Sequence, residues 1–435
     1  MKIVSRILLG LVLVLFATCK TNEPVNNNEP VDQGRAAKRG VSFTFELVDD
    51  VTLLGPGISW SYNWGSSQPA IFDNVVKQHN IDFFPMAWNG VDAAKLREYK
   101  QRHPECKYIL AFNEPNLNDQ AKMTPSQAAA KWPELKAIAA ELNLKIVSPA
   151  MNYGTLSGYS DPIKWLDEFF QLVPISDIDA IAIHCYMSYA SATKSYIERF
   201  KKYQKPIWMT EFCAWDAGVG TITPHFQMKY MCDIVNYMEC DPDIERYAWF
   251  IPRSGKTTDV SKENQFPYMN LLSKTTPVEL TELGKVYINM STMDKSIYYA
   301  QGQVIQAEHY SNICISECVN EKGWIDGPSL QPTTDQTGGV LDLYNFSRFQ
   351  WVEYQVNVSG SGQIPFTIRY AASANVELDL YVDGSDVPIE LSLPKTGGEA
   401  TWATETTGVN LSKGKHTLRL RVLKGTLNVN WLKFG

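Results

Sequence analysis

The chain has 435 residues, of which 44% are hydrophobic and 20% are charged, so it can build a buried core and does not belong among globally disordered proteins. A formal net charge of −7 and the lack of a basic run in the mature chain exclude the electrostatic footprint of a nucleic-acid-binding protein. The length predicts two to three domains, or one large barrel with an accessory module. Aromatic residues make up 12% of the chain, and its 12 tryptophans suit either large cores or flat ligands such as sugar rings.

Residues 1–19 have the form of a lipoprotein-type signal peptide. A basic start precedes the apolar run Ile7–Phe16, which is too short to span a bilayer as a stable anchor. Small residues then lead to Cys19, the expected site of lipid attachment, with cleavage by an ordinary signal peptidase as the alternative. Residues 20–39 are rich in Asn and Pro and predict a tether. We therefore expect an exported lipoprotein of the bacterial cell envelope, on its periplasmic or cell-surface side.

The seven cysteines after Cys19 include no C-x-x-C pair and no Cys/His cluster at zinc spacing, which argues against a metal site of that type. Two pairs are close enough in sequence to form short disulfides in an oxidising compartment, Cys232–Cys240 and Cys314–Cys318. Because the total is odd, at least one thiol stays free, most simply as a buried apolar side chain.

Residues 40–295 alternate apolar, strand-like runs with capped helices, and near-continuous apolar runs are typical of parallel strands buried on both faces. Seven runs are expected as strands: Gly57–Asn63, Ile81–Ala87, Tyr108–Glu114, Lys145–Met151, Ile178–Tyr186, Pro206–Phe212 and Glu245–Ile251. An eighth lies at Val41–Leu47 or in a weaker segment near the end of this region. Since no Gly-rich phosphate loop interrupts the alternation, it favours an α/β fold of the (β/α)8 barrel type over a doubly wound sheet.

Three helices are expected to start where a capping side chain precedes a proline at the first helical position, at Thr124, Asp161 and Thr223. Gln127 completes a capping box with Thr124.

Residues 302–435 follow a different pattern, in which short alternating runs are separated by Gly and Asn turns. Such alternation indicates antiparallel strands buried on one face. Five runs are expected as strands: Trp351–Val358, Pro365–Tyr370, Val376–Val382, His416–Val422 and Thr426–Phe434. The pattern predicts an all-β jelly-roll sandwich after the barrel, with the boundary within residues 291–302.

Two glutamates, Glu114 and Glu211, end strand-like runs of the predicted barrel. Charged residues are rare at the end of a buried apolar strand unless they have a partner or a function. Because the carboxyl ends of barrel strands meet at one face, both side chains could reach one cleft, where paired carboxylates suit glycoside hydrolysis. Two unrelated glutamates in salt bridges at the rim are the alternative.

The context of these glutamates resembles a known family. Asn113-Glu114-Pro115 resembles the acid/base motif, and Thr210-Glu211-Phe212 the nucleophile strand, of the large clan of retaining glycosidases built on (β/α)8 barrels. More narrowly, six motifs in the same order resemble glycoside hydrolase family 128, the β-1,3-glucanases. They are GISWSYNWG (57–65), FPMAW (84–88), FNEP (112–115), SPA (148–150), IHCY (183–186) and YAWF (247–250).

The resemblance implies a retaining mechanism with Glu114 as acid/base and Glu211 as nucleophile, and no cofactor for catalysis. The two carboxyl groups should then lie ~5–5.5 Å apart, and Glu114 needs a raised pKa. The resemblance also gives Asn113 a hydrogen bond to the 2-hydroxyl of the sugar beside the cleaved bond. His184 and Tyr186 end the preceding strand run and are candidates for orienting the nucleophile, with a core histidine as an equal alternative.

Five tryptophans lie at or just beyond strand ends of the barrel: Trp60, Trp64, Trp88, Trp215 and Trp249. Together with Asn63 they are expected to bind substrate, because indole faces can stack on pyranose rings. We expect two of the five to serve packing instead.

The C-terminal region resembles carbohydrate-binding module family 6 in five motifs, IQAEHY (305–310), WVEY (351–354), PFTIRYA (365–371), GKHTLRL (414–420) and NVNWL (428–432). The resemblance implies a sugar site at the tip of the sandwich, where Tyr344 and Trp402 form an aromatic clamp assisted by Asn430. Glu308 resembles the family's structural calcium ligand, although Tyr310 stands where a second acidic ligand is expected.

We therefore expect a monomeric, secreted glycoside hydrolase that cleaves β-1,3-glucan, with a β-glucan polysaccharide or oligosaccharide as its partner. We expect no nucleic-acid partner, and membrane contact only through the lipid anchor. Two alternatives stay open: a retaining glycosidase of the same clan acting on another β-linked glycan, and a non-catalytic glycan-binding lipoprotein of the cell surface.

Overall fold

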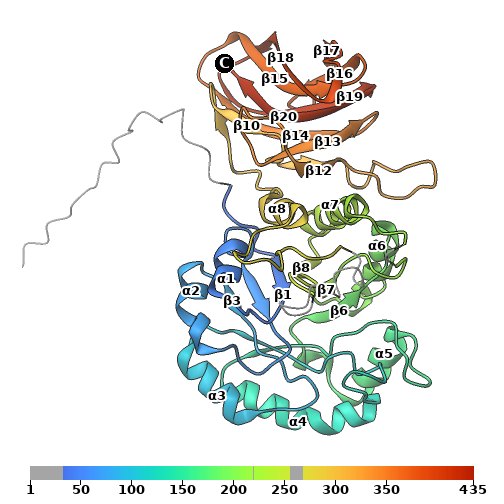
Figure 1. Cartoon of the computed structure of the whole chain (residues 1–435). Helices are drawn as coiled ribbons and strands as arrows, with labels where there is room; N and C mark the ends of the chain where they lie inside the picture. The colour runs from blue at the N-terminus through green and yellow to red at the C-terminus, as the bar shows by residue number, and fades with distance from the viewer. Residues whose placement is uncertain (1–32, 219, 255–267) are drawn as a thin grey trace, which may run out of the picture.

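The computed structural model describes residues 33–218, 220–254 and 268–435, which form a (β/α)8 barrel followed by a β-sandwich (Figure 1). The predicted fold class is confirmed. The predicted signal peptide of residues 1–19, its Cys19 and tether residues 20–32 lie outside the described residues and stay predictions. In the described part of the chain, no helix has both the length and the apolar character needed to cross a membrane.

Eight parallel strands build the barrel. They pair in the order β3-β2-β1-β8-β7-β6, with β4 beside β5. Isolated bridges from Met86 to Leu110 and from Val147 to Ala180 close the ring. The strands are β1 Arg39–Ser42, β2 Trp60–Tyr62, β3 Asp82–Phe83, β4 Tyr108–Leu110, β5 Lys145–Val147, β6 Ile181–Cys185, β7 Ile207–Phe212 and β8 Ile244–Trp249.

The eighth strand is β1, which overlaps the first of its two predicted positions and pairs with both β2 and β8. It starts earlier than predicted, and the chain before it already contacts the barrel. The Arg35 guanidinium donates to the carbonyl oxygen of Ile58 at 2.9 Å. The buried Arg39 side chain donates to the carbonyl oxygen of Tyr287 in α8 (Glu282–Asn289). The end of the predicted tether therefore belongs to the folded domain.

Eight helices surround these strands in the described part of the chain. They are α1 Val48–Leu54, α2 Asp73–Gln78, α3 Ala93–Arg102, α4 Pro125–Glu141, α5 Pro162–Leu172, α6 Ala190–Glu198, α7 Pro224–Cys240 and α8 Glu282–Asn289, with short 3-10 turns at Ala70–Phe72, Ile175–Asp177 and Lys201–Tyr203. The three predicted N-caps are confirmed, because Thr124, Asp161 and Thr223 each accept a backbone N–H of the first turn. The capping box of Thr124 and Gln127 is also present.

The sandwich consists of two antiparallel sheets, β12-β13-β20-β15-β18 and β11-β14-β19-β16-β17, with β10 and β9 added at β20 and β14. All five predicted strands are confirmed. The strands are β9 Tyr299–Ala300, β10 Val304–Gln306, β11 Asn312–Ile313, β12 Ser329–Pro332, β13 Leu341–Ser347, β14 Trp351–Val358, β15 Gly362–Ala372, β16 Val376–Val382, β17 Ile389–Leu393, β18 Gly398–Leu411, β19 Gly414–Lys424 and β20 Thr426–Phe434.

The cysteine predictions are confirmed in part. Cys314 and Cys318 form a disulfide, but Cys232 and Cys240 are both free. These two lie on the single helix α7, where Cys232 is buried and Cys240 is exposed, so their side chains face different surroundings. The expectation of buried free thiols is confirmed by Cys106, Cys185 and Cys213.

A buried ion pair joins the start of α1 to the segment after β8. The Arg253 guanidinium donates to both carboxylate oxygens of Asp50, and both side chains are fully buried. Asp50 also accepts the backbone N–H groups of Glu46 and Leu47, each at 3.0 Å. Removing one partner of such a pair leaves an uncompensated buried charge.

We therefore expect Asp50→Ala to lower the free energy of unfolding by about 3–5 kcal/mol, measured by chemical denaturation. Lys202→Ala, which breaks an ion pair with Asp167 between half-exposed side chains, is the control and should change it little. Equal effects of the two substitutions would contradict this account.

Candidate active site

The two glutamates occupy the carboxyl-end rim of the barrel, after β4 and within β7. The chain at Glu114 is held by a bridge between Asn113 and Ala150, the residue three positions beyond β5. Glu114 itself has φ +43°, in the left-handed region that costs free energy for a residue with a side chain. Strain of this kind persists where the surroundings enforce it and is found preferentially at functional sites.

Glu211 is buried within a set of hydrogen-bond donors. Its Oε1 accepts the Tyr62 hydroxyl at 2.8 Å and the Trp64 indole N–H at 2.7 Å, and its Oε2 accepts the Tyr186 hydroxyl. Such donors fix the orientation of the carboxylate and stabilise its charge. Tyr186 therefore does orient Glu211.

His184 bridges the two glutamates from beneath. Its Nδ1 lies 2.9 Å from Glu114 Oε1 and 3.3 Å from Glu211 Oε2. Glu114 Oε1 also accepts the side-chain amide of Asn152 at 3.0 Å. One carboxylate oxygen of each glutamate and one imidazole nitrogen all lie within 4.8 Å of one another. The rim interpretation of two unrelated glutamates in separate salt bridges is therefore wrong.

These three groups also form a donor set that a divalent cation could bridge. The lone pairs of Glu211, however, already accept donors from Tyr62, Trp64 and Tyr186 and face His184. The arrangement thus suits a reacting carboxylate better than a metal ligand.

The charges of the three groups depend on one another. Burial raises the pKa of Glu211, and the nearby Glu114 carboxylate adds to the rise. Burial acts in the same direction on Glu114, but the hydrogen bond and charge of His184 outweigh it and lower the pKa of Glu114. Burial opposes protonation of His184, yet the two carboxylates raise its pKa. The expectation of a raised pKa for Glu114 is therefore wrong for the free protein, because the hydrogen bond and charge of His184 outweigh burial there.

A cavity of about 490 Å³ opens above the two carboxylates. Its lining combines five aromatic residues with six polar or charged ones, and aromatic walls with convergent polar groups are found in sites for small organic ligands. It is lined by Trp64, Trp88, Asn113, Glu114, Leu117, Gln120, Asn152, Tyr186, Glu211, Trp215, Asp216 and Phe250. The structure thus brings most of the site residues expected from the sequence to one place, with His184 directly behind them.

Three expected substrate-binding residues lie elsewhere. Trp60 fills the barrel interior against Trp208, one layer below Tyr62, which points the same way along β2. Trp249 points outward, where its indole N–H donates to the Met269 carbonyl oxygen. Asn63 accepts the Gly65 N–H and so holds the loop that carries Trp64. The prediction that these side chains line the cleft is wrong, whereas the expectation that two of the five tryptophans serve packing is confirmed.

Several residues of the site were not expected from the sequence. Tyr62 and Asn152 contact the carboxylates, and Phe250 takes the wall position expected for its neighbour Trp249. The sequence did contain a signal for Phe250. Successive strand residues point to opposite faces, so only one of Trp249 and Phe250 can face the cavity.

In the sandwich, the expected sugar clamp is not assembled. Tyr344 packs edge-on against His225 of α7, with ring centroids 4.8 Å apart. Strands β20 and β15 separate β13 from β18, so Tyr344 and Trp402 lie roughly 14 Å apart. Asn430 is buried and donates to Asp335 Oδ2. The asparagine in register with Trp402 is Asn428 instead, because Ala371 of β15 pairs with Trp402 on one side and with Asn428 on the other. The prediction of a clamp made by Tyr344, Trp402 and Asn430 is therefore wrong.

Glu308 belongs to a group of buried oxygen atoms that have no hydrogen-bond partner among the described residues. The group comprises Glu308 Oε2, Gln306 Oε1, Asn430 Oδ1 and both carboxylate oxygens of Asp342. Burial raises the pKa of Glu308 and of Asp342, each to about 8. A side chain at Gly339 would meet both Asn430 Oδ1 and Gln306 Oε1 at 2.7 Å, so these two oxygens lie side by side. Several oxygen ligands around one point are what Ca²⁺ requires.

Comparison with known proteins places the barrel in a family. Residues 40–287 match the family described as Glycosyl hydrolase catalytic core. An endo-β-1,3-glucanase of glycoside hydrolase family 128 (subgroup II) from Pseudomonas viridiflava is 36% identical, and the match covers 58% of this chain and 98% of that one, with a TM-score of 0.52. The chain belongs to glycoside hydrolase family 128. A second subgroup II endo-β-1,3-glucanase of the family, from Sorangium cellulosum, is 32% identical, covers 58% of this chain and 97% of its own, and has a TM-score of 0.51.

One further match covers the C-terminal region, and two are to proteins longer than this chain. Residues 321–435 match the family described as Carbohydrate binding module (family 6). The alkali-sensitive linkage protein 1 of Schizosaccharomyces pombe is 27% identical over 266 residues, which are 58% of this chain and 45% of that protein. The clotting factor G alpha subunit of Tachypleus tridentatus is 27% identical over 145 residues, 32% of this chain and 21% of that one. The chain spans less than half the length of these two curated relatives.

Proposed function

We propose that this family 128 hydrolase cleaves β-1,3-glucan by a retaining double displacement. The observation that carries the proposal is the Glu114–Glu211 pair, with one oxygen of each within 4.8 Å, at the floor of an aromatic cavity. A retaining enzyme needs carboxyl groups close enough for direct attack, about 5–5.5 Å apart, whereas an inverting one leaves room for a water at about 6.5–9.5 Å. The β-1,3-glucanase activity of the two solved relatives supports the choice of substrate.

In the first step the Glu211 carboxylate attacks the anomeric carbon while Glu114 protonates the departing glycosidic oxygen. This forms a glycosyl ester on Glu211. In the second step Glu114 removes a proton from water, the water oxygen attacks the anomeric carbon, and Glu211 leaves as a carboxylate. The proton that Glu114 delivers is shared along its 2.9 Å hydrogen bond to His184, which can pass it over as a neutral imidazole forms.

Other groups bind and orient the sugar. Asn113 has a buried Oδ1 without a hydrogen-bond partner among the described residues, beside Glu114 at the cavity wall, and we assign its side chain to the 2-hydroxyl of the sugar beside the cleaved bond. Trp64, Trp88 and Trp215 present indole rings to the same cavity and offer surfaces for pyranose rings. The C-terminal module is assigned to binding of glycan outside this cavity.

We expect Glu211→Ala and Glu114→Ala each to lower kcat on laminarin by about 10³-fold or more. On an aryl laminarioside, whose leaving group departs without a proton, azide should rescue each variant differently, because the small anion fills the space of the lost carboxylate. It should replace the nucleophile in Glu211→Ala and give the α-glycosyl azide, and it should attack the glycosyl ester in Glu114→Ala and give the β-glycosyl azide, as read by NMR.

Glu141→Gln, which changes an exposed glutamate of α4, is the control and should behave as the wild type. Azide products of the opposite stereochemistry would mean that Glu114 is the nucleophile and Glu211 the acid/base. Full activity of Glu211→Ala would contradict the double-displacement mechanism. Release of reducing sugar from other β-linked glycans, but not from laminarin or curdlan, would favour the related-glycosidase alternative.

A second prediction concerns pH. The positive charge of His184 favours the ionised form of both glutamates. Replacing it with a neutral side chain should therefore raise the pKa of Glu114, where only the Asn152 hydrogen bond then opposes burial, and raise that of Glu211 further. The acidic limb of kcat/KM reports ionisation of the nucleophile and the basic limb loss of the acid's proton. Both limbs should therefore move to higher pH in His184→Asn. His103→Asn, far from the site on the turn after α3, should leave the profile in place, and a shift of His184→Asn to lower pH would contradict the assignment.

We also propose that Gln306, Glu308 and Asn430 hold a structural calcium ion in the sandwich, with Asp342 close by. The support is their group of buried, unpartnered oxygen atoms around the turn at Gly339. An ion there would join the end of β10 to β20 and the turn before β13, and so would stabilise the module without taking part in hydrolysis.

Calcium should therefore raise the melting temperature of the wild-type protein relative to EDTA, because an ion about a hundredfold above its Kd adds about 2.7 kcal/mol to stability. Glu308→Gln should lose most of this calcium-dependent increase, whereas Glu399→Gln on the exposed part of β18 should retain it. An equal response of the wild type and Glu308→Gln in differential scanning calorimetry would contradict the site.

A further inference from the structure

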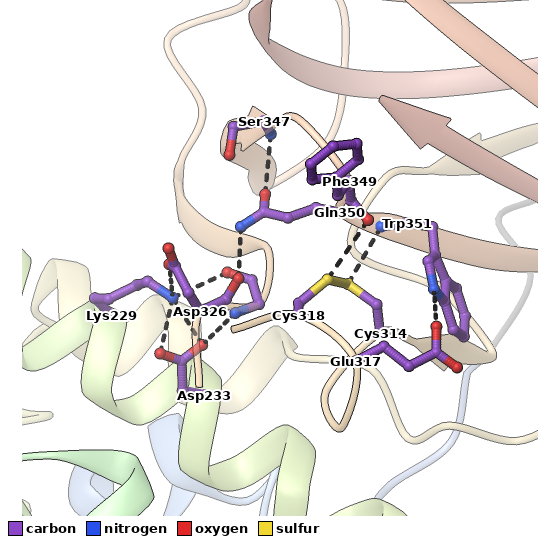
Figure 2. The surroundings of a disulfide bond; sticks show 11 residues. Lys229, Asp233, Cys314, Glu317, Cys318, Asp326, Ser347, Phe349, Gln350 and Trp351 are labelled. Atoms are coloured by element: carbon purple, nitrogen blue, oxygen red, sulfur yellow. Dashed lines mark hydrogen bonds and ion pairs between the residues drawn. A yellow bond between two sulfur atoms is a disulfide. The ribbon is translucent and has the colours of Figure 1, made fainter. Parts of the chain in front are cut away.

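Residues 314–327 of the sandwich form a loop that reaches down to the barrel. The Cys314–Cys318 disulfide closes the first turn of this loop, next to the sandwich (Figure 2). The sulfur of Cys314 accepts the backbone N–H of Trp351, and the side-chain amide of Gln350 donates to the Asp326 carbonyl oxygen at 2.8 Å. The loop is thus attached to the sandwich at both of its ends.

The far side of the loop is attached to the barrel. Lys229 of α7 lies between two carboxylates, 2.7 Å from Asp233 of the same helix and 3.0 Å from Asp326 of the loop (Figure 2). Asp233 Oδ1 also accepts the Gly327 N–H, and Ser191 at the start of α6 accepts the Ile325 N–H at 2.7 Å. These contacts hold the loop in one position, so whatever it presents is preorganised.

What the loop presents is an exposed aromatic pair. Trp324 is 37% exposed and packs on Tyr189, which is 42% exposed and precedes α6, with ring centroids 4.9 Å apart. The two rings border a hollow of about 260 Å³ shared by the loop, α6 and α7. The ammonium of exposed Lys322 lies 4.8 Å from the Trp324 ring centre on a flexible stem that can swing aside. A contiguous exposed apolar surface rimmed by polar residues is one of the features that mark ligand-binding grooves.

The hollow adjoins the catalytic cavity. Ser188 lines the hollow, Asp216 lines the catalytic cavity, and Asp216 Oδ1 accepts both the backbone N–H and the hydroxyl of Ser188. Tyr186 and Tyr189 are three residues apart, so their Cα atoms are at most about 11 Å from each other. One hydrogen-bonded pair of residues therefore separates the two spaces.

We propose that the glucan-binding cleft continues from the catalytic cavity across Ser188 and Asp216 to Trp324 and Tyr189, which bind a distal glucosyl unit of the same chain. The proposal rests on the function assigned above. It makes the second domain part of the substrate site, because the loop adds the Trp324 ring to the Tyr189 ring of the barrel. The occupant is the glucan chain itself, since the hollow continues from the place where that chain is cleaved.

The experiment compares kcat/KM of the wild type and Trp324→Ala on laminari-oligosaccharides of increasing length. Short oligosaccharides fill only the catalytic cavity, so their kcat/KM should not change. Long ones reach the loop, and their kcat/KM should fall about tenfold through KM, the loss expected when one sugar ring no longer covers an indole face. Trp324→Tyr, which keeps an aromatic surface, should restore most of the difference.

Val319→Ala removes another exposed apolar side chain of the same loop and should change neither class of substrate. Equal losses of Trp324→Ala on short and long oligosaccharides, or no loss on long ones, would overturn the proposal, and melting temperatures of all variants separate binding from folding. A wild type that hydrolyses none of these oligosaccharides would instead remove the proposed function.

Discussion

Closure of the barrel by β1 is the constraint on which the remaining structure depends. This short strand joins β2 to β8, and only a closed ring makes the carboxyl ends of all eight strands meet at one rim. Arg39 holds β1 in place, because its buried guanidinium donates to the carbonyl oxygens of Tyr287, Met290 and Ser291. The same residues lead the chain out of α8 toward the sandwich, so one cation both closes the barrel and sets where the second domain begins.

The chemistry at this rim depends on charged side chains that are buried away from solvent. Glu114 and Glu211 are buried and close, a combination that is unfavourable unless a third group compensates it. His184 is that group, and it reaches both carboxylates with one nitrogen atom. Its own pKa rises because of the negative charges that it stabilises. The free energy needed to keep this trio buried, and to hold Glu114 at a positive φ, comes from the packed barrel beneath it.

The two domains are joined by polar contacts as well as by apolar packing. Lys229 and Asp326 form an ion pair (Figure 2). Tyr310 donates to Asn236 of α7 at 3.1 Å, and the Leu330 N–H lies 3.3 Å from the sulfur of Cys232. Directional contacts of this kind restrict how the sandwich can rotate on the barrel. This explains why the position of the loop around Trp324 relative to the catalytic rim is a property of the fold.

The sequence by itself determined both domains, the helix caps at Thr124, Asp161 and Thr223, and the glutamates at two strand ends, because hydrophobic periodicity, capping chemistry and motifs are local properties of a chain. It did not determine which neighbouring aromatic faces the cleft, as Trp60 and Trp249 demonstrate, since one residue of strand register moves a side chain to the opposite face. Nor did the sequence predict that Tyr62 and Asn152 contact the glutamates. It also did not predict that Cys232 stays free, or that Tyr344 packs on His225 and not beside Trp402. Those outcomes depend on contacts between residues far apart in the chain, and only the closed barrel and its docking to the sandwich decided them.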